Sequence, residues 1–534
     1  MMKYPIGIQT FDKIINGGFL YIDKTALIYQ LVQGSTYFLG RPRRFGKSLL
    51  ISTLESYFLG KKELFKGLAI DSLETEWKQY PVFHIDFGTG NYLNDGTLEE
   101  TLNAHLCEWE RQYSITNSYK DFGLRMSKIL STAHEKTGLG CVVLIDEYDK
   151  PILDALDLNT KVEHLGIQMT LEDKHRNIMK SFYATFKSAD ADLRFVFLTG
   201  VTKFSQISVF SGFNQPDDIS LNRKYEAICG ITQEELVKYF AEPIAEFAED
   251  YECSQEEMLQ KLQVKYDGYH FSKRMTDIFN PFSILNAFNQ MDLGNYWFKS
   301  GTPTYLIRLL THSDENLNDL VGKYYATSQF DDYKADVEKP LPMIYQSGYL
   351  TIKGFDRDTQ SYLLDIPNNE VREGFLTILA NNYLKTKEDS ASWLINSVTL
   401  LKKGNLQAFM DSLTAFLSSI PYSVRRRNDE REYERYFGYT FYLLLRMLSC
   451  YIVFREKETS QGRADCIYET PTDVYIFEFK LDGSVDQALQ QIENKGYAKE
   501  YLSDKRIVHQ IGVNFSSEKG TIESWKEKIQ DIQK

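Results

Sequence analysis

The sequence lacks the long apolar run that a membrane-spanning helix requires. No stretch of about 18 or more uninterrupted apolar residues occurs in it. The first residues, MMKYPIGIQTFDKIINGG, also lack the apolar core of a secretory signal peptide. These two absences predict a cytoplasmic protein with no membrane partner.

Paired cysteines are missing as well. The six cysteines are scattered, and none forms the C-x-x-C pair that marks zinc sites and redox-active dithiols. Cys141 and Cys466 lie in apolar, strand-like runs, so we expect buried free thiols rather than disulfides or a zinc site. None of the eight histidines forms a recognisable pair. We expect His84 and His270 to be structural and assign no catalytic histidine.

An excess of positive charge is also absent. The formal net charge is −13, which argues against a protein that coats nucleic acid over its whole surface. The net charge does not exclude a local basic groove, because arginines cluster at Arg41, Arg43 and Arg44 and again at residues 425–427. Acidic residues follow the second cluster at once, so a solvated helix end is the alternative interpretation of those three arginines.

The length of 534 residues indicates about three domains rather than one core. In the first third, strand-like and helical segments alternate, which predicts a parallel, doubly wound sheet with its sites at the carboxyl ends of the strands. We place one domain at residues 1–230, a mostly helical region at 231–405 and a last domain at 406–534. The segments behind this division are expected strands at residues 37–40, 81–87, 141–145, 193–198, 348–353, 361–366, 463–468 and 474–480, and expected helices at residues 48–58, 98–109, 171–187 and 485–502.

Residues 40–48 (GRPRRFGKS) lie between an apolar strand and a helix. A phosphate-binding loop needs a turn rich in backbone N–H groups at such a place, a lysine for the terminal phosphates, and a hydroxyl for Mg²⁺. Lys47 and Ser48 meet the last two needs, although Arg41 stands where the first glycine is usual. The sequence therefore predicts ATP at this loop, with Ser48 on the metal. The loop residues expected to contact the nucleotide are Arg44, Phe45, Gly46, Lys47, Ser48 and Leu49.

The apolar run at residues 142–145 ends in two acids. In an ATPase, Asp146 would hold Mg²⁺ and Glu147 would polarise the attacking water. A buried strand that ends at a polar cap would look the same, but the G-K-S motif upstream favours the ATPase interpretation. After a later strand, Thr199 or Thr202 could sense the γ-phosphate, and a hydroxyl that satisfies a local turn fits them equally well.

Two carboxylates and a lysine are expected to converge in the last domain. Glu478 and Lys480 share one face of a strand, because side chains alternate along it, and a hairpin can bring Asp465 beside them. Such carboxylates suit Mg²⁺ or Mn²⁺, which would activate water, while Lys480 would position the nucleophile. Glu434 is a candidate further metal ligand, and Gln491 is placed to hydrogen-bond near the site. An edge-strand salt bridge is the alternative interpretation of this E-x-K triplet.

These motifs resemble a known family. Segments that carry the resemblance span most of the chain: residues 21–25 (YIDKT), 41–48 (RPRRFGKS), 144–149 (LIDEYD), 211–214 (SGFN), 218–219 (DI), 266–269 (YDGY), 280–283 (NPFS) and 346–350 (QSGYL). They are similar to bacterial AAA-ATPase-like proteins that carry a C-terminal PD-(D/E)XK nuclease domain. That family also carries arginine at the position of Arg41, whereas Asp267 stands where asparagine is common.

The resemblance implies an α/β fold in three parts. These are an ASCE-type, AAA-like P-loop sheet, a helical and winged-helix-like middle region, and an α/β nuclease-like domain. It implies an enzyme in which ATP binding or hydrolysis controls a metal-dependent nuclease, with DNA expected over RNA as the partner and a homo-oligomer compatible with the family. The alternative function is a nucleotide-binding regulatory or adaptor protein whose C-terminal domain binds nucleic acid or a partner without cutting.

Overall fold

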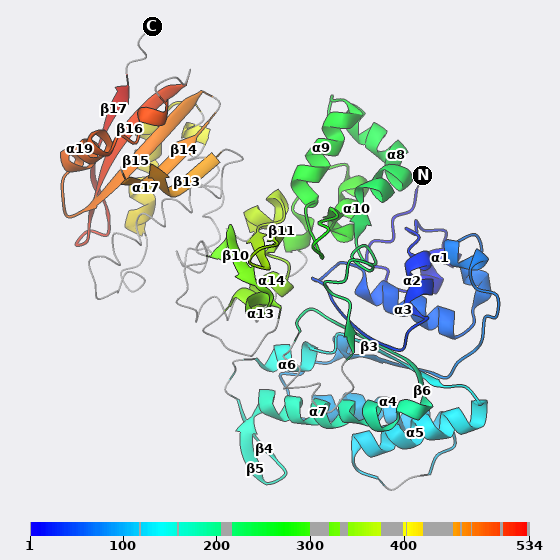
Figure 1. Cartoon of the computed structure of the whole chain (residues 1–534). Coiled ribbons are helices and arrows are strands. Elements are labelled where there is room, and N and C mark those ends of the chain that lie inside the picture. The colour runs from blue at the N-terminus through cyan, green and yellow to red at the C-terminus, as the bar shows by residue number, and fades with distance from the viewer. Residues whose placement is uncertain are drawn as a thin grey trace. The chain divides into compact units, whose positions relative to one another are not determined.

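The chain forms two compact units, Met1–Val371 and Arg372–Lys534 (Figure 1). The computed structural model describes residues 2–116, 119–156, 158, 160–203, 216–299, 320–331, 340–374, 399–401, 403–419, 452–459, 462–470, 472–501 and 506–530. No helix in these ranges is both long and apolar enough to cross a membrane. The division into three domains that the sequence suggested stays a prediction.

A parallel five-stranded sheet organises the first unit. Its strands, in spatial order, are β2 (Val82–Asp86), β3 (Cys141–Asp146), β6 (Leu193–Gly200), β1 (Thr36–Gly40) and β7 (Asp217–Asp218). Every residue of β3 is buried, as expected for a strand covered on both faces. Because β6 pairs with both β1 and β3, the carboxyl ends of these three strands meet at one edge. This arrangement confirms the predicted α/β fold.

Helices cover both faces of this sheet (Figure 1). One layer holds α4 (Thr97–Gln112), α5 (Phe122–Thr137) and α7 (Leu171–Ser188), and the other holds α1 (Phe11–Asn16), α2 (Thr25–Leu31) and α3 (Lys47–Phe58). In α5, Met126, Ile129, Leu130 and Ala133 are buried, which is the spacing of one helical face. Asp121 caps that helix by accepting from the Leu124 amide.

An exposed hairpin that the sequence did not reveal follows α6 (Lys150–Ala155). It consists of β4 (Lys161–His164) and β5 (Ile167–Thr170). Its two-residue turn has positive φ at both Leu165 and Gly166, which matches the primed turns that suit hairpin twist. The hairpin leads directly into α7.

The rest of the first unit is helical with a small sheet. Helices α8 (Gln233–Asp250), α9 (Gln255–Tyr266) and α10 (Pro281–Gln290) share one apolar core, and α11 (Tyr296–Lys299) follows. An antiparallel sheet of β10 (Lys323–Ala326), β12 (Ser361–Asp365) and β11 (Thr351–Asp356) accompanies α13 (Thr327–Phe330) and α14 (Leu341–Gln346). The short strands β8 (Ile231–Thr232) and β9 (Ile278–Phe279) pair with each other. These elements agree with the expected helical and winged-helix-like region.

The second unit is built on a mixed five-stranded sheet. Its strands, in spatial order, are β13 (Ile452–Thr459), β14 (Gly462–Glu469), β15 (Asp473–Leu481), β16 (Ile507–Ser516) and β17 (Thr521–Gln530). Only the pair β15–β16 is parallel among these four pairings. Helix α17 (Leu406–Ser419) packs on one face with Tyr475, Phe477 and Phe479, and α19 (Val485–Lys495) packs on the other with Val474 and Ile476.

Two expectations for local structure were wrong. The helix predicted to reach about residue 502 ends at Lys495, because Gly496 adopts a left-handed φ of 63° and caps it. All five described cysteines are free, but Cys107 is exposed rather than buried.

Candidate functional site

Arg41 stands where the first glycine of a phosphate-binding loop is usual. Its side chain is almost fully buried, with 1% of its surface exposed. The guanidinium donates to the carbonyls of Ser220 and Tyr225, at 2.8 and 3.3 Å, and lies over the Phe271 ring at 4.0 Å. Arg41 therefore anchors the chain that follows β7.

The loop between Arg41 and α3 has the backbone that phosphate binding requires. Arg44 and Gly46 both have positive φ, at 67° and 92°, and Gly46 is the residue from which α3 begins. The ammonium group of Lys47 donates hydrogen bonds to the carbonyls of Arg41 and Pro42, at 2.9 and 3.0 Å. Phe45 points the other way and packs on buried aromatic rings of the middle region.

Carboxylates from β3 face this lysine. Burial lowers the pKa of Lys47, and the nearby charge of Asp146 opposes that shift. Burial raises the pKa of Glu147, and Lys47 opposes that shift in turn. Glu147 also has a left-handed φ of 52°, a strained conformation of the kind found at functional sites. The structure thus brings Lys47, Asp146 and Glu147 together as the sequence indicated.

Two threonines at the end of β6, Thr199 within the strand and Thr202 just after it, are each held by an acid. Thr199 donates its hydroxyl to Asp146 at 2.5 Å. Asp149 accepts from the Val201 amide and from both the amide and the hydroxyl of Thr202, and so ties the end of β3 to the end of β6. The bond of Thr202 matches the local turn interpretation, whereas Thr199 contacts a candidate metal ligand.

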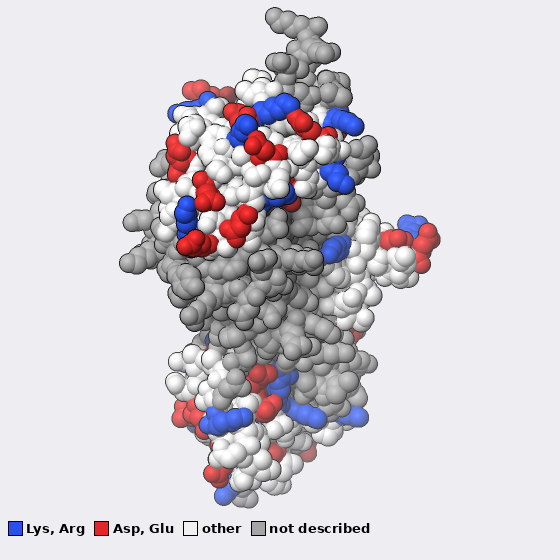
Figure 2. Space-filling model, turned by 90° about the vertical axis from the view of Figure 1, so that its left-hand side faces the viewer, with Lys and Arg blue, Asp and Glu red and all other residues white. Residues whose placement is uncertain are grey.

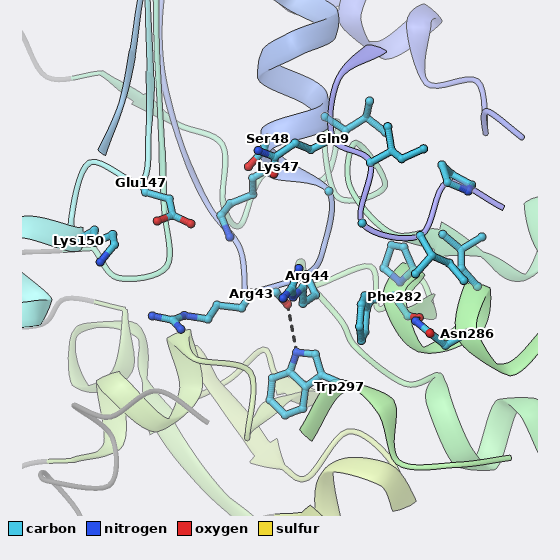
Figure 3. A pocket seen from close by; sticks show the side chains of 18 of the residues that line it. Gln9, Arg43, Arg44, Lys47, Ser48, Glu147, Lys150, Phe282, Asn286 and Trp297 are labelled. Carbon is cyan, nitrogen blue, oxygen red and sulfur yellow. Dashed lines mark hydrogen bonds between the residues drawn. The ribbon is translucent and has the colours of Figure 1, made fainter. Parts of the chain in front are cut away.

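A cavity of about 610 Å³ opens beside the loop, a size suited to a nucleotide (Figure 3). Of the residues predicted to contact ATP, Arg44, Gly46, Lys47, Ser48 and Leu49 line it, together with Glu147. Phe45, Asp146 and Thr199 do not line it. Figure 3 shows Glu147 and Lys150 on one side, Lys47 reaching into the middle, Phe282 and Asn286 on the opposite side, and Trp297 below Arg44.

Another part of the lining of this cavity comes from segments that no chemical motif in the sequence marked. It consists of Pro5, Ile6, Gly7, Ile8, Gln9, Leu93, Pro281, Phe282, Leu285, Asn286 and Trp297. Apart from Gln9 and Asn286 these residues are apolar, as a nucleobase would require. The segment at residues 280–283 carried the family resemblance, and that was the one signal pointing to it. Arg43 also lines the cavity and adds positive charge, whereas Lys150 is paired at 2.6 Å with Asp154, another lining residue.

Asp465, Glu478 and Lys480 come together in the second unit. Glu478 lies on the α19 face of β15, opposite the aromatic face. Lys480 donates to Glu478 at 3.4 Å and to Gln491 on α19 at 2.9 Å. Asp465 accepts from the Phe479 amide at 2.8 Å, which holds it beside Glu478. Burial, followed by the charge of Asp465, raises the pKa of Glu478 to about 8.

The donor set at Glu478 fits a bound cation in part. Oε2 of Glu478 is buried and has no hydrogen-bond partner among the described residues. A buried oxygen without a partner lowers the stability of the fold. A divalent cation between Asp465 and Glu478 would satisfy that oxygen. The described ranges hold no group of three or more His, Cys, Asp or Glu side chains placed for a metal. Glu434, the proposed further ligand, lies outside the described residues.

The described surface shown in Figure 2 mixes both signs of charge. In the second unit, Lys526 pairs with Asp486 at 2.9 Å, Lys519 pairs with Glu523 at 3.0 Å, and Lys528 pairs with Glu493. Paired cations attract a polyanion weakly, so we find no reason to place a nucleic-acid path over these lysines. The basic cluster at residues 425–427 lies outside the described residues.

Comparisons with known proteins agree with this geometry. Residues 5–210 match the family model described as predicted AAA-ATPase, and residues 432–525 match the PD-(D/E)XK nuclease superfamily. The chain is 35% identical over 529 residues to a protein of Azotobacter chroococcum mcd 1 named "Uncharacterized protein in vnfD 5'region". That alignment covers 97% of this chain and 98% of the relative.

Proposed function

Because the chain belongs to the family of AAA-ATPase-like proteins with a C-terminal PD-(D/E)XK nuclease domain, we propose that it hydrolyses ATP and cuts nucleic acid at a separate, metal-dependent site. One observation carries the proposal: each predicted set of polar residues converges in its own unit, around Lys47 in the first and around Glu478 in the second. ATP binding or hydrolysis would control the nuclease, with DNA as the expected substrate.

At the first site, the loop amides and Lys47 would hold the phosphates of ATP. Ser48 and Asp146 would hold Mg²⁺, which neutralises phosphate charge. Glu147 would take a proton from the attacking water, and the raised pKa that burial gives it suits a proton acceptor. Thr199 would orient Asp146 through their hydrogen bond. The adenine base of ATP would lie against Phe282 and Leu285 on the apolar wall.

At the second site, Asp465 and Glu478 would hold Mg²⁺ or Mn²⁺, with Glu434 as a further ligand. The metal would supply an activated water and screen the phosphodiester charge. Lys480 would hold the nucleophile or the developing negative charge, and Gln491 would keep the ammonium in place through their 2.9 Å bond. Without a cation, two carboxylates would face an anionic substrate, which is electrostatically unfavourable.

ATP binding can be tested by isothermal calorimetry and by turnover. Lys47→Ala should abolish binding, because it removes the cation that meets the phosphates. Glu147→Gln should bind ATP with near-normal affinity but lose turnover. A wild-type protein that neither binds nor is thermally stabilised by millimolar ATP would refute this half of the proposal.

Nuclease activity can be tested with purified protein on single- and double-stranded DNA and RNA. Cleavage should stop in EDTA and return with Mg²⁺ or Mn²⁺. Asp465→Ala and Glu478→Ala should lose both metal binding and cutting. Lys480→Ala should still bind the metal but should no longer cleave nucleic acid at an appreciable rate. All three variants should keep ATP turnover, which serves as the control for folding. Cutting that persists in EDTA would refute the metal-dependent site, whereas nucleic-acid binding without any cutting would favour the adaptor alternative.

A further inference from the structure

A tryptophan from outside the sheet domain contacts the backbone of the phosphate-binding loop. Trp297, in α11, lines the nucleotide cavity and is buried, with 6% of its surface exposed. Its indole N–H donates to the carbonyl of Arg43 at 3.1 Å (Figure 3). Arg43 lies in the middle of the loop, between Arg41 and Gly46. The position of this carbonyl is therefore coupled to the position of the indole ring.

One buried carboxyl bonds both α10 and α11, the two helices that contribute Phe282 and Trp297 to the cavity wall. Glu370 accepts from the backbone amide of Trp297 at 2.7 Å through one oxygen. Its other oxygen accepts from the hydroxyl of Ser283 at 2.6 Å. Ser283 lies in the first turn of α10, next to Phe282, which lines the cavity. Glu370 itself is 1% exposed, so water cannot replace these two bonds at low cost.

Glu370 also lies at the end of the first unit. Val371 is the last residue of that unit, and Arg372 begins the second. Asn368 anchors the same segment, because its side chain accepts from the Val371 amide and donates to the Asp267 carbonyl, at 3.0 and 2.8 Å. The end of the first unit is thus fixed by Asp267 and is bonded, through Glu370, to Trp297 of the nucleotide cavity.

We propose that Trp297 is a positioning residue for the phosphate-binding loop and that Glu370, which orients it, transmits the state of the nucleotide site to the segment that leads into the second unit. This inference rests on the proposed function, because it requires ATP at the loop. Filling the loop with phosphates fixes the Arg43 carbonyl and hence the indole. Since protein interiors are close-packed, the bond from the Trp297 amide carries that constraint to Glu370. ATP binding then changes how freely the backbone of residues 366–374 moves.

The tryptophan step is tested by Trp297→Phe, which keeps an aromatic ring in the cavity and removes the indole N–H. ATP affinity should fall about fivefold, which is the value of one ordinary hydrogen bond. The change in tryptophan fluorescence on adding ATP should disappear. Trp109→Phe is the matched control, because Trp109 is equally buried, at 6% exposed, but lies on α4 and packs on Phe83. Equal ATP affinity and an unchanged fluorescence response in Trp297→Phe would overturn the positioning role.

The transmission step is tested by hydrogen–deuterium exchange of the peptide at residues 366–374, with and without ATP. Exchange in wild type should slow at least twofold with ATP. Glu370→Ala should bind ATP yet lose this response, whereas Glu370→Gln should keep it, because the amide can still accept from Trp297 and bond Ser283. Glu226→Ala removes an equally enclosed carboxyl that bonds Ser272 and Thr276 instead, and should respond like wild type.

The outcomes separate this inference from the function on which it rests. A wild-type protein that does not bind ATP refutes the proposed function. Wild-type protein that binds ATP but shows unchanged exchange at residues 366–374 refutes only the transmission. A response that persists in Glu370→Ala refutes it as well. If Glu370→Ala fails to fold, Trp297→Phe supplies the same test, because it should bind ATP more weakly and at saturation lose the exchange response.

Discussion

Arg41 shows how a side chain that looks misplaced in a phosphate-binding loop can be structural. It fills a buried site behind the loop and donates to carbonyls of the segment that includes Ser220 and Tyr225. We expect Arg41→Ala to lower the free energy of unfolding by about 2–4 kcal/mol, because several buried carbonyls lose their donor. Urea denaturation measures this loss. Arg44→Ala, at an exposed position in the same loop, should change it by less than about 0.5 kcal/mol. Equal effects of the two changes would contradict the structural role.

Asp267 is a buried acid, with 5% of its surface exposed. Burial raises the pKa of its carboxyl from 3.8 to about 7, and its Oδ1 has no hydrogen-bond partner among the described residues. A raised folded pKa means that the folded state binds the proton more tightly. The wild type therefore loses stability as pH rises from about 4 through 7.

Asp267→Asn should remove this pH dependence, because asparagine has the same shape and no charge. At pH 8 the variant should be more stable than wild type by about 2–4 kcal/mol, and at pH 5 the gap should shrink to a fraction of that value. Urea denaturation at pH 5, 6, 7 and 8 gives the difference directly, since other titrating groups cancel between the two proteins. A gap that stays constant with pH would show that the carboxyl does not titrate in this range.

At the scale of elements, the turn after α14 meets the phosphate-binding loop at a glycine. Gly348 has a φ of 90°, and a Cβ placed there would lie 2.7 Å from the Cβ of Pro42. Gly348→Ala should lower the free energy of unfolding by about 2 kcal/mol or more and weaken ATP binding, because the clash displaces the loop. Gly138→Ala is the matched control, with a φ of 67° and open space around it. This control should lower the free energy of unfolding by only about 1 kcal/mol and leave ATP affinity unchanged.

The elements that the sequence predicted well are those whose signal is local. Strand β3 is a continuous apolar run ending in acids, and α3 follows a glycine-containing loop, so both were placed within a residue or two. The hairpin of β4 and β5 was missed because each strand has only 4 residues and the turn between them lacks the Asn-Gly or Asp-Gly pair that usually marks a hairpin. The strands β16 and β17 were missed too, although they complete the second sheet.

The side of the nucleotide site that would hold the phosphates was predictable for the same reason. Lys47 and Glu147 belong to short motifs whose chemistry can be recognised in one stretch of sequence. Trp297 and Glu370 belong to no such motif, because their roles arise from bonds between segments far apart in the chain. In the second unit, strand alternation placed Glu478 and Lys480 on one face, and the bond between Lys480 and Gln491 followed from that placement.

At the scale of the whole molecule, charge limits where nucleic acid can bind. The net charge is −13, and the described lysines of the second unit at positions 519, 526 and 528 are each paired with an acid. A polyanion is therefore attracted most strongly where cations are clustered. The arginine run at residues 425–427 is the densest basic cluster outside the phosphate-binding loop. This cluster belongs to the domain that we expect to cleave nucleic acid.

We predict that these three arginines contact the phosphates of the substrate. Replacing Arg425, Arg426 and Arg427 with Gln should weaken binding of duplex DNA and flatten the slope of log K against log salt by about 0.9 for each lost phosphate contact. Replacing Lys519, Lys526 and Lys528 with Gln removes the same charge from paired surface positions, so that slope should stay within error of wild type. Fluorescence anisotropy from 50 to 200 mM salt, about the range in which such contacts change affinity most visibly, measures both. If the two triple variants behave alike, net charge alone governs binding and the arginine cluster is a solvated helix end.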